Sequence, residues 1–333
     1  MPLPFILGGA ALLAAGYGAK KGLDAKDDFD TAERWNNKAQ NIYDEAQSKL
    51  EISKETTDSK LQDLGELKVD IYENSLKDFS VTFAKIQNVD FQDNLALGTL
   101  SSVDEQDVLD IQNTVLKMEE VLGGGVAALG SGALAGFGAL GGVGMLASAS
   151  TGTAIASLSG AAATNATLAW LGGGALSAGG FGMAGGMAVL GGIVAGPVLA
   201  VGGAMMASKA EEAKHTAYSN YDKSEAAAEQ MDSACIVLDG IYQRAEEFTE
   251  TLEPLNEILE DKIDELEEIV NRSFDWRTYT QEEKESVMAT ASLATTVKNI
   301  CDAPIIDEDG KVTRKSKRII KKAKELIQKL NEV

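Results

Sequence analysis

The sequence predicts an all-α fold: an elongated helical bundle with coiled-coil arms on either side of a central Gly/Ala-rich hydrophobic helical hairpin that inserts into membranes. Residues 121–208 form an 88-residue run without a charged side chain or histidine, and this run holds 25 of the 34 glycines. One bilayer crossing needs only ~20 apolar residues. Outside this run and a short apolar start, the chain is densely charged and carries apolar residues at helical spacing.

Composition changes sharply near residues 120 and 209, and these changes set the expected domain boundaries. We expect an apolar N-terminal segment (1–21), a first helical arm (22–120), the hydrophobic membrane block (121–208), a second long helical arm (209–271) and C-terminal helices with a basic amphipathic end (272–333). The apolar start is uncharged until Lys20 and Lys21. Because a secretory signal carries its positive charge before the apolar core, we expect an uncleaved anchor or interfacial segment, with a buried core helix as the alternative.

The charge balance and the cysteine count restrict the possible functions. A net charge of −21 argues against nucleic-acid binding, which depends on neutralising phosphates with Lys and Arg. The two cysteines, Cys235 and Cys301, lack disulfide or zinc spacing, and His215 is the sole histidine. Most catalytic constellations cannot be built from this set. We therefore expect a protein that is not an enzyme and that has no metal or cofactor.

The first arm has apolar residues at steps of three, four or seven, the a/d pattern of a bundle or coiled-coil helix. They are Ala25, Phe29, Ala32, Ala39, Tyr43, Ala46 and Leu50, followed by Leu61, Leu64, Ile71, Phe79, Phe83 and Ile86. We expect two helices, or one long helix broken between 54 and 59, and then a loop over 88–101. Ser102 and Glu105 predict a capping box that opens the next helix. The apolar face of that helix is Val108, Ile111, Val115, Met118 and Leu122.

The second arm keeps one heptad frame for roughly five heptads, which predicts a long helix packed against partners. Its frame is Ala217, Tyr221, Ala228, Met231, Cys235, Leu238, Tyr242, Ala245 and Leu252. Pro254 is expected to kink this helix or to start a new one. Residues 246–268 contain eleven acids and one lysine. Because they lack the ligand spacing and central glycine of a calcium loop, we expect a solvated face rather than a cation site.

The C-terminal region begins with a second capping box, Thr280 with Glu283, which opens a helix that stops before Pro304. A turn follows at 307–310. The last helix, 313–330, has one apolar side, and basic residues surround the rest: Arg314, Lys315, Lys317, Arg318, Lys321, Lys322 and Lys324. Such a helix can lie on anionic lipid or dock on the acidic stretch 246–268, and the sequence leaves both readings open.

Inside the block, small residues repeat every four positions, a glycine-zipper pattern that lets two helices approach closely in lipid. The longer ladder is Gly180, Ala184, Ala188, Gly192, Gly196, Ala200 and Ala204, and the shorter one is Gly124, Ala128, Gly132 and Gly136. The two apolar halves, 121–147 and 181–207, predict a hairpin with its tip near 148–168. Leucine and isoleucine are sparse, so the block is also suited to a sheltered, soluble state or to packing within a soluble bundle.

Two long helical arms around a Gly/Ala-rich hydrophobic hairpin resemble helical pore-forming proteins of the cytolysin A type and, more loosely, apolipoprotein L. The resemblance rests on residues 121–208 and the flanking heptads. It is one of layout, so no residue role is carried over, and this block is longer and richer in glycine than is usual in that toxin family. The resemblance implies a hairpin that is sheltered in a soluble form and then released to insert and oligomerise.

We therefore expect a membrane-inserting, self-assembling helical protein that forms pores or permeabilises membranes. Its expected partners are a lipid bilayer and further copies of itself, and its expected location is a membrane, with a soluble form before insertion. The alternative is a non-enzymatic, membrane-anchored coiled-coil scaffold whose acidic arms recruit a protein partner.

Overall fold

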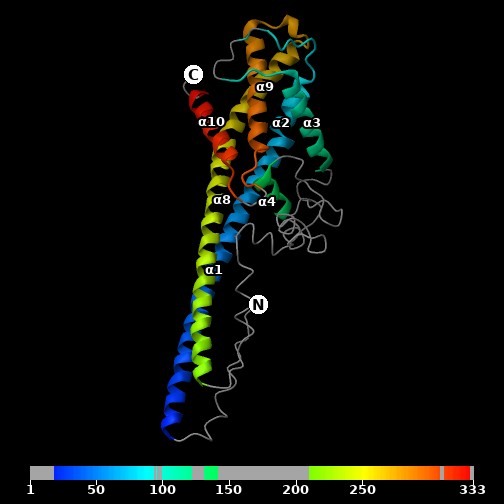
Figure 1. Cartoon of the computed structure of the whole chain (residues 1–333). Helices are drawn as coiled ribbons and strands as arrows, with labels where there is room; N and C mark the ends of the chain where they lie inside the picture. The colour runs from blue at the N-terminus through cyan, green and yellow to red at the C-terminus, as the bar shows by residue number, and fades with distance from the viewer. Residues whose placement is uncertain are drawn as a thin grey trace. The chain divides into compact units, whose positions relative to one another are not determined.

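The computed structural model describes residues 19–93, 95, 100–121, 131–141, 210–307 and 311–330 (Figure 1). All regular secondary structure in these ranges is helical, apart from two isolated β-bridges, Gln87 with Asp275 and Ile306 with Val312. The predicted all-α class is therefore confirmed for the described part of the chain. The apolar start and most of the block, including the predicted hairpin, lie outside these ranges.

The helices are α1 (Ala19–Glu73), α2 (Ser75–Phe83), α3 (Glu105–Val121), α4 (Ser131–Leu140), α8 (Ala210–Arg272), α9 (Gln281–Cys301) and α10 (Arg314–Leu330), with a short 3-10 helix η5 (Trp276–Thr278). The chain forms two compact units. Unit 1 takes the chain up to Lys54 together with 190–238, and unit 2 takes 55–189 and 239–333. Both α1 and α8 contribute to each unit. No helix within the described ranges is long and apolar enough to cross a membrane.

In unit 1, α1 and α8 lie side by side and run in the same direction (Figure 1). Lys214 Nζ lies 3.0 Å from Asp28 Oδ1, and Asn220 Nδ2 donates to Asn36 Oδ1 at 3.1 Å. The paired positions therefore differ by 186 and 184 residues, a nearly constant offset that only parallel helices give. Both helices begin at the same end of the pair. The core farther along is small: Ala46, Leu50, Met231, Ala234 and Leu238.

The heptad frame predicted for the second arm is correct in one of its two columns. Ala217, Met231, Leu238, Ala245 and Leu252 are buried. Tyr221, Ala228, Cys235 and Tyr242 are only half-buried, and the second buried column lies one residue earlier, at Asn220, Ala227, Ala234, Ile241 and Phe248. Positions three and four residues apart share one helix face, so the pattern allows either column. Tyr221, Cys235 and Tyr242 favoured the wrong column, whereas the buried column begins with the smaller Asn220, Ala227 and Ala234.

The predicted break in the first arm and the predicted start of a new helix at Pro254 are both absent from the structure. α1 runs without interruption through 54–59, where Thr57 is buried, and the chain first leaves the helix at Asn74. α8 continues through Pro254 instead of starting a new helix there. Leu252 and Leu255 on either side of the proline are completely buried. Tertiary packing thus offsets the lost backbone hydrogen bond, which in isolation costs about 3 kcal/mol.

The two predicted capping boxes have different outcomes. At α9, the Thr280 hydroxyl accepts from the Glu283 amide and the Glu283 carboxylate accepts from the Thr280 amide, as predicted. At α3, the reciprocal bonds join Asp104 and Asp107, at 3.1 and 2.9 Å. The prediction for Ser102 and Glu105 was wrong because aspartates can form the same pair of bonds two residues later.

In unit 2, α2 and α3 pack against α9, and the centre of this packing is apolar. The apolar face predicted for α3 is confirmed: Val108, Ile111, Val115 and Met118 are all buried. Leu122 lies outside the described residues. The segment after α8 is anchored by Trp276, which is buried and donates from Nε1 to Asp93 at 2.9 Å. Unit 2 also holds α4, the described helix of the charge-free block.

The register of α8 predicts that substitutions at two neighbouring positions will change the free energy of unfolding by different amounts. Leu238 is 2% exposed and Ile236 is 72% exposed. Leu238→Ala should lower the free energy of unfolding by about 2–5 kcal/mol, whereas Ile236→Ala should change it by less than about 0.5 kcal/mol. Urea unfolding followed by circular dichroism measures both. Equal effects of the two substitutions would show that this register is wrong.

Candidate functional site: a clamp around helix α4

α4 lies in backbone contact with α1. A Cβ atom added at Gly65 would lie 2.0 Å from the carbonyl oxygen of Leu134, and one added at Gly138 would lie 2.0 Å from the carbonyl oxygen of Leu61. No side chain fits at either position, so the two glycines together permit this crossing. Around it, Leu134 and Phe137 of α4 are buried against the bundle.

Lys68 lies one helical turn beyond Gly65 and holds the end of α4. Its side chain is completely buried, and Nζ donates to the carbonyl oxygen of Gly138 at 3.0 Å and, more weakly, to that of Phe137 at 3.4 Å. These carbonyls belong to the last turn of α4, where the helix dipole is negative and a cation is stabilising. Nζ also lies 5.4 Å from the centre of the Phe248 ring.

Burial lowers the pKa of Lys68 to about 8, while the charges of Cys301 and Asp302 act in the opposite direction. The ammonium is therefore still charged at neutral pH. A buried charge is expensive unless it is paired. Here the carbonyl oxygens of α4 provide much of that pairing, so the lysine and the helix end stabilise each other.

Beyond α4 the chain turns sharply at Gly141, whose φ is +61°. Its amide donates to the carbonyl oxygen of Phe137 at 3.0 Å, the usual closure of a helix C-terminus by a left-handed glycine. The carbonyl oxygen of Ala139 accepts from the amides of Ile305 and Ile306 at 2.8 and 3.3 Å. The end of α4 is therefore held both by α1 and by the described residues 302–307 and 311–313, which we call the strap.

The first residue of the strap, Asp302, is itself fixed by other helices. Tyr72 of α1 donates its hydroxyl to Asp302 Oδ1 at 2.6 Å, and Lys298 of α9 lies 3.1 Å from Asp302 Oδ2. Lys298 also pairs with Asp110 of α3. Burial raises the pKa of the Tyr72 hydroxyl well above 10, with a further contribution from Cys301 and Asp302. For Lys298, burial acts to lower the pKa, but the bonds to Asp110 and Asp302 raise it overall.

The protonation state of Cys301 and the possible metal ligands describe the chemistry of this cluster. Cys301 is completely buried, and burial raises its pKa to about 12, so the side chain is a thiol and not the reactive thiolate. Among the side chains that the structure describes, no group of three His, Cys, Asp or Glu residues is arranged to hold a metal ion. The contacts of the cluster hold one end of α4.

The residues predicted from sequence relate to this clamp only in part. Gly132 and Gly136 lie in α4, but the crossing glycine is Gly138, outside the four-residue ladder, and its partner is Gly65. An isolated glycine within a helical pattern was the available signal for Gly65. Gly124, Ala128 and the ladder from Gly180 to Ala204 lie outside the described residues.

The basic residues predicted on the last helix are all exposed on α10. Within the described residues, Lys324 is the member of this set with an ion pair to the acidic stretch of α8, 3.6 Å from Glu250. Lys321 pairs within α10, with Glu325 at 3.8 Å. Ser316, Ile320 and Ala323 face the bundle and are buried.

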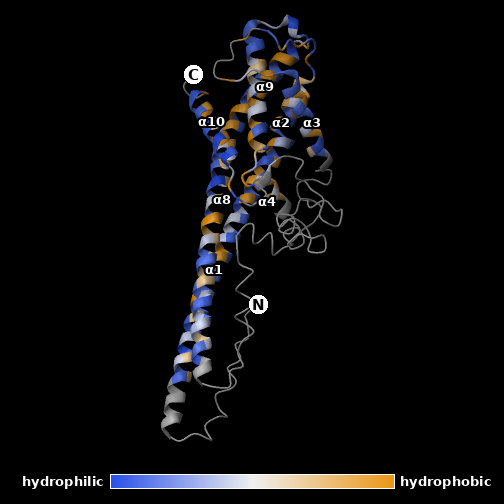
Figure 2. Cartoon of the chain, viewed as in Figure 1, coloured by the Kyte–Doolittle hydropathy of each residue, from blue (hydrophilic) through white to orange (hydrophobic). Residues whose placement is uncertain are grey.

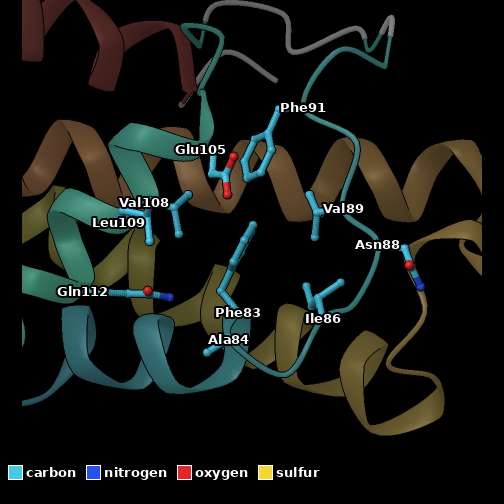
Figure 3. Close-up of a pocket in the computed structure, with 10 residues that line it drawn as sticks. All are labelled: Phe83, Ala84, Ile86, Asn88, Val89, Phe91, Glu105, Val108, Leu109 and Gln112. Carbon is cyan, nitrogen blue, oxygen red and sulfur yellow. The ribbon is translucent and has the colours of Figure 1, made fainter.

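A cavity of about 350 Å³ opens between α2, the segment after it and α3 (Figure 3). Its walls are mainly apolar, and the rings of Phe83 and Phe91 face each other with their centres 6.3 Å apart. Glu105 supplies a carboxylate to the lining. The cavity and the clamp have no lining residue in common.

No protein-family model matches this chain, and neither the curated protein sequences nor the solved structures contain a match. The function must therefore be inferred from the structure itself.

The glycine crossing predicts opposite effects for two glycine-to-alanine substitutions. Gly65→Ala places a Cβ against the backbone of α4 and should destabilise unit 2 by about 1–3 kcal/mol. Gly240 of α8 has only Val312 Cγ2 nearby, at 3.9 Å, so Gly240→Ala should stabilise by up to about 1 kcal/mol. Thermal unfolding compares the two variants. Stabilisation by Gly65→Ala would contradict the backbone contact.

The burial of Cys301 predicts that the stability of the folded protein depends on pH. The thiol has an ordinary pKa of 9.0, and in the folded protein burial raises it to about 12. Its contribution to stability is therefore complete below pH 9 and is lost as the pH rises toward 12. Between about pH 8 and about pH 10.5, wild type should lose stability relative to Cys301→Ala. Urea unfolding across this range measures the difference, and a constant difference would refute the assignment.

Proposed function

We propose that this chain is a membrane-inserting, self-assembling helical protein that shelters part of its hydrophobic block in a helical bundle before insertion. The observation that carries the proposal is the parallel pairing of α1 and α8 in unit 1. Residues 1–18 directly precede α1, and the charge-free block ends at 208, with one residue before α8 begins at 210. Since both helices begin at the same end of the pair, both uncharged segments join it at that end and can reach the same bilayer.

The composition of the block supports insertion in a helical form. Glycine costs ~1 kcal/mol relative to alanine in a soluble helix, but in hydrocarbon an unpaired backbone costs several kcal/mol per group, so helices persist there despite glycine. The four-residue ladder then provides a smooth face along which helices from several copies can pack closely. The heptads of the arms are suited to coiled-coil packing between copies, which is the arrangement that a pore requires.

The clamp supports a sheltered state before insertion. α4 has ten residues and is about 15 Å long, half of the hydrocarbon thickness. The left-handed Gly141 ends it at the strap. Once released, a continuous helix over 121–147 would be about 40 Å long and could cross the bilayer. Burial of Leu134 and Phe137 contributes about 1.5–3 kcal/mol each, a modest barrier compared with the gain from burying a long apolar segment in lipid.

The decisive experiment removes the block but keeps the clamp. Residues 142–208 are replaced by a Gly/Ser linker of equal length, which leaves every described helix in place. The wild type should float with liposomes and release an entrapped dye, whereas the linker variant should keep its helical circular dichroism and release no dye.

Two results would contradict this function. Dye release by the linker variant at the wild-type level would show that residues 142–208 do not govern membrane insertion. Permanent membrane association of the wild type without dye release would favour the anchored scaffold instead.

A further inference from the structure

The helix α10 concentrates positive charge in an otherwise acidic chain. Eight of its 17 residues are Lys or Arg and one is acidic, so it holds more than a quarter of the 30 basic residues of the protein. Figure 2 shows it as mostly hydrophilic ribbon with hydrophobic residues along one side. Its basic residues are exposed, whereas Ser316, Ile320 and Ala323 are buried and Ile319, Leu326, Ile327 and Leu330 are half-buried.

Among the described residues, one ion pair joins α10 to the acidic stretch of α8. The pair between Lys324 and Glu250 is 3.6 Å long, and both side chains are about half exposed or more. Such a pair contributes about 0–1 kcal/mol. Each basic residue near an anionic membrane surface contributes ~1 kcal/mol, and α10 presents eight. An anionic bilayer is therefore a stronger partner for this face than the rest of the chain.

A continuous path of hydrogen bonds connects α10 to the clamp. Thr313 precedes α10 and caps it, its hydroxyl oxygen accepting from the Ser316 amide at 3.0 Å. Its own amide donates to the carbonyl oxygen of Ile305 at 2.7 Å, and its hydroxyl donates to that of Pro304 at 2.8 Å. The amide of Ile305 in turn donates to Ala139, in the last turn of α4. One short strap thus holds the start of α10 and the end of α4 together.

We propose that α10 senses an anionic membrane surface and that its movement onto that surface opens the clamp through the strap. Only three residues of α10 are fully buried, so the helix can exchange its place on the bundle for the lipid interface, where its apolar face becomes buried. Thr313 moves with it. The amides of Ile305 and Ile306 then no longer donate to the carbonyl oxygen of Ala139. The hydrogen bonds from Lys68 Nζ become the main contacts that keep α4 in place. The inference rests on the membrane insertion proposed above and adds its trigger.

The test uses the full-length protein with vesicles of phosphatidylcholine alone and vesicles that also contain phosphatidylglycerol. Two readouts are followed: vesicle binding by flotation, and amide hydrogen exchange of residues 131–141 by mass spectrometry. For the wild type, the anionic vesicles should bind at least about tenfold more tightly and should speed exchange in α4. Neutral vesicles should leave α4 protected.

The variant neutralises four exposed basic residues of α10 by Lys317→Gln, Arg318→Gln, Lys321→Gln and Lys322→Gln. It should lose at least about tenfold in binding to anionic vesicles and should keep α4 protected. The matched control removes the same charge from exposed lysines elsewhere, by Lys38→Gln, Lys49→Gln, Lys85→Gln and Lys117→Gln, and should behave as wild type. A third variant, Gly65→Ala, should show fast α4 exchange even without vesicles.

Several outcomes would overturn this inference. Equal loss of binding in the four-residue variant and its control would mean that overall charge is sensed rather than α10. Tight binding of wild type with unchanged α4 exchange would refute the coupling. Binding of a single-stranded oligonucleotide that competes fully with the vesicles would assign α10 to another polyanion.

If dye release from neutral and anionic vesicles were equal in all variants, the proposed insertion would stand without this trigger. If α4 responded without dye release, the trigger would stand and the proposed function would fail.

Discussion

The contact between Gly65 and Gly138 is the constraint on which the candidate site depends. Because neither residue has a side chain, α4 comes close enough to α1 for Lys68 to reach the carbonyl oxygens in the last turn of α4. The same approach places Ala139 within hydrogen-bonding distance of the strap. A single methyl group at the crossing would move α4 outward, and Lys68 would then be a buried ammonium without adequate partners, a costly arrangement.

The chain uses lysine in two contrasting environments within unit 2. Lys68 is completely buried, and its charge is stabilised by fixed carbonyl dipoles. The lysines of α10 are solvated and are held in place by little beyond their helix. A buried charge with dedicated partners gives a specific, short-range hold, whereas solvated charges act over about a Debye length, ~8 Å at physiological salt. The environment of Lys68 is suited to holding one helix against another, and the environment of the α10 lysines is suited to recognising a charged surface.

Features determined by local sequence could be predicted, and those determined by tertiary packing could not. The capping box at Thr280 and the two faces of α10 depend on residues three or four positions apart, and both were predicted. The continuity of α8 through Pro254 depends on the packing of Leu252 and Leu255, which the proline itself does not signal. The clamp was missed for the same reason, since Gly65, Lys68 and Ile305 come together only when three distant segments have folded.

The hydrogen bond between Asn220 and Asn36 has a consequence for the geometry of the parallel helices. In this polar pair Asn220 is buried and Asn36 is half-buried, and the pair favours one register because a shift leaves an amide without its partner. The alanines around it would tolerate a shift, since each resembles the next one along the heptad. A slip of one heptad would displace one helix end relative to the other by about 10 Å, a third of the hydrocarbon thickness. The asparagine pair therefore helps to fix the register in which α1 and α8 lie side by side in unit 1.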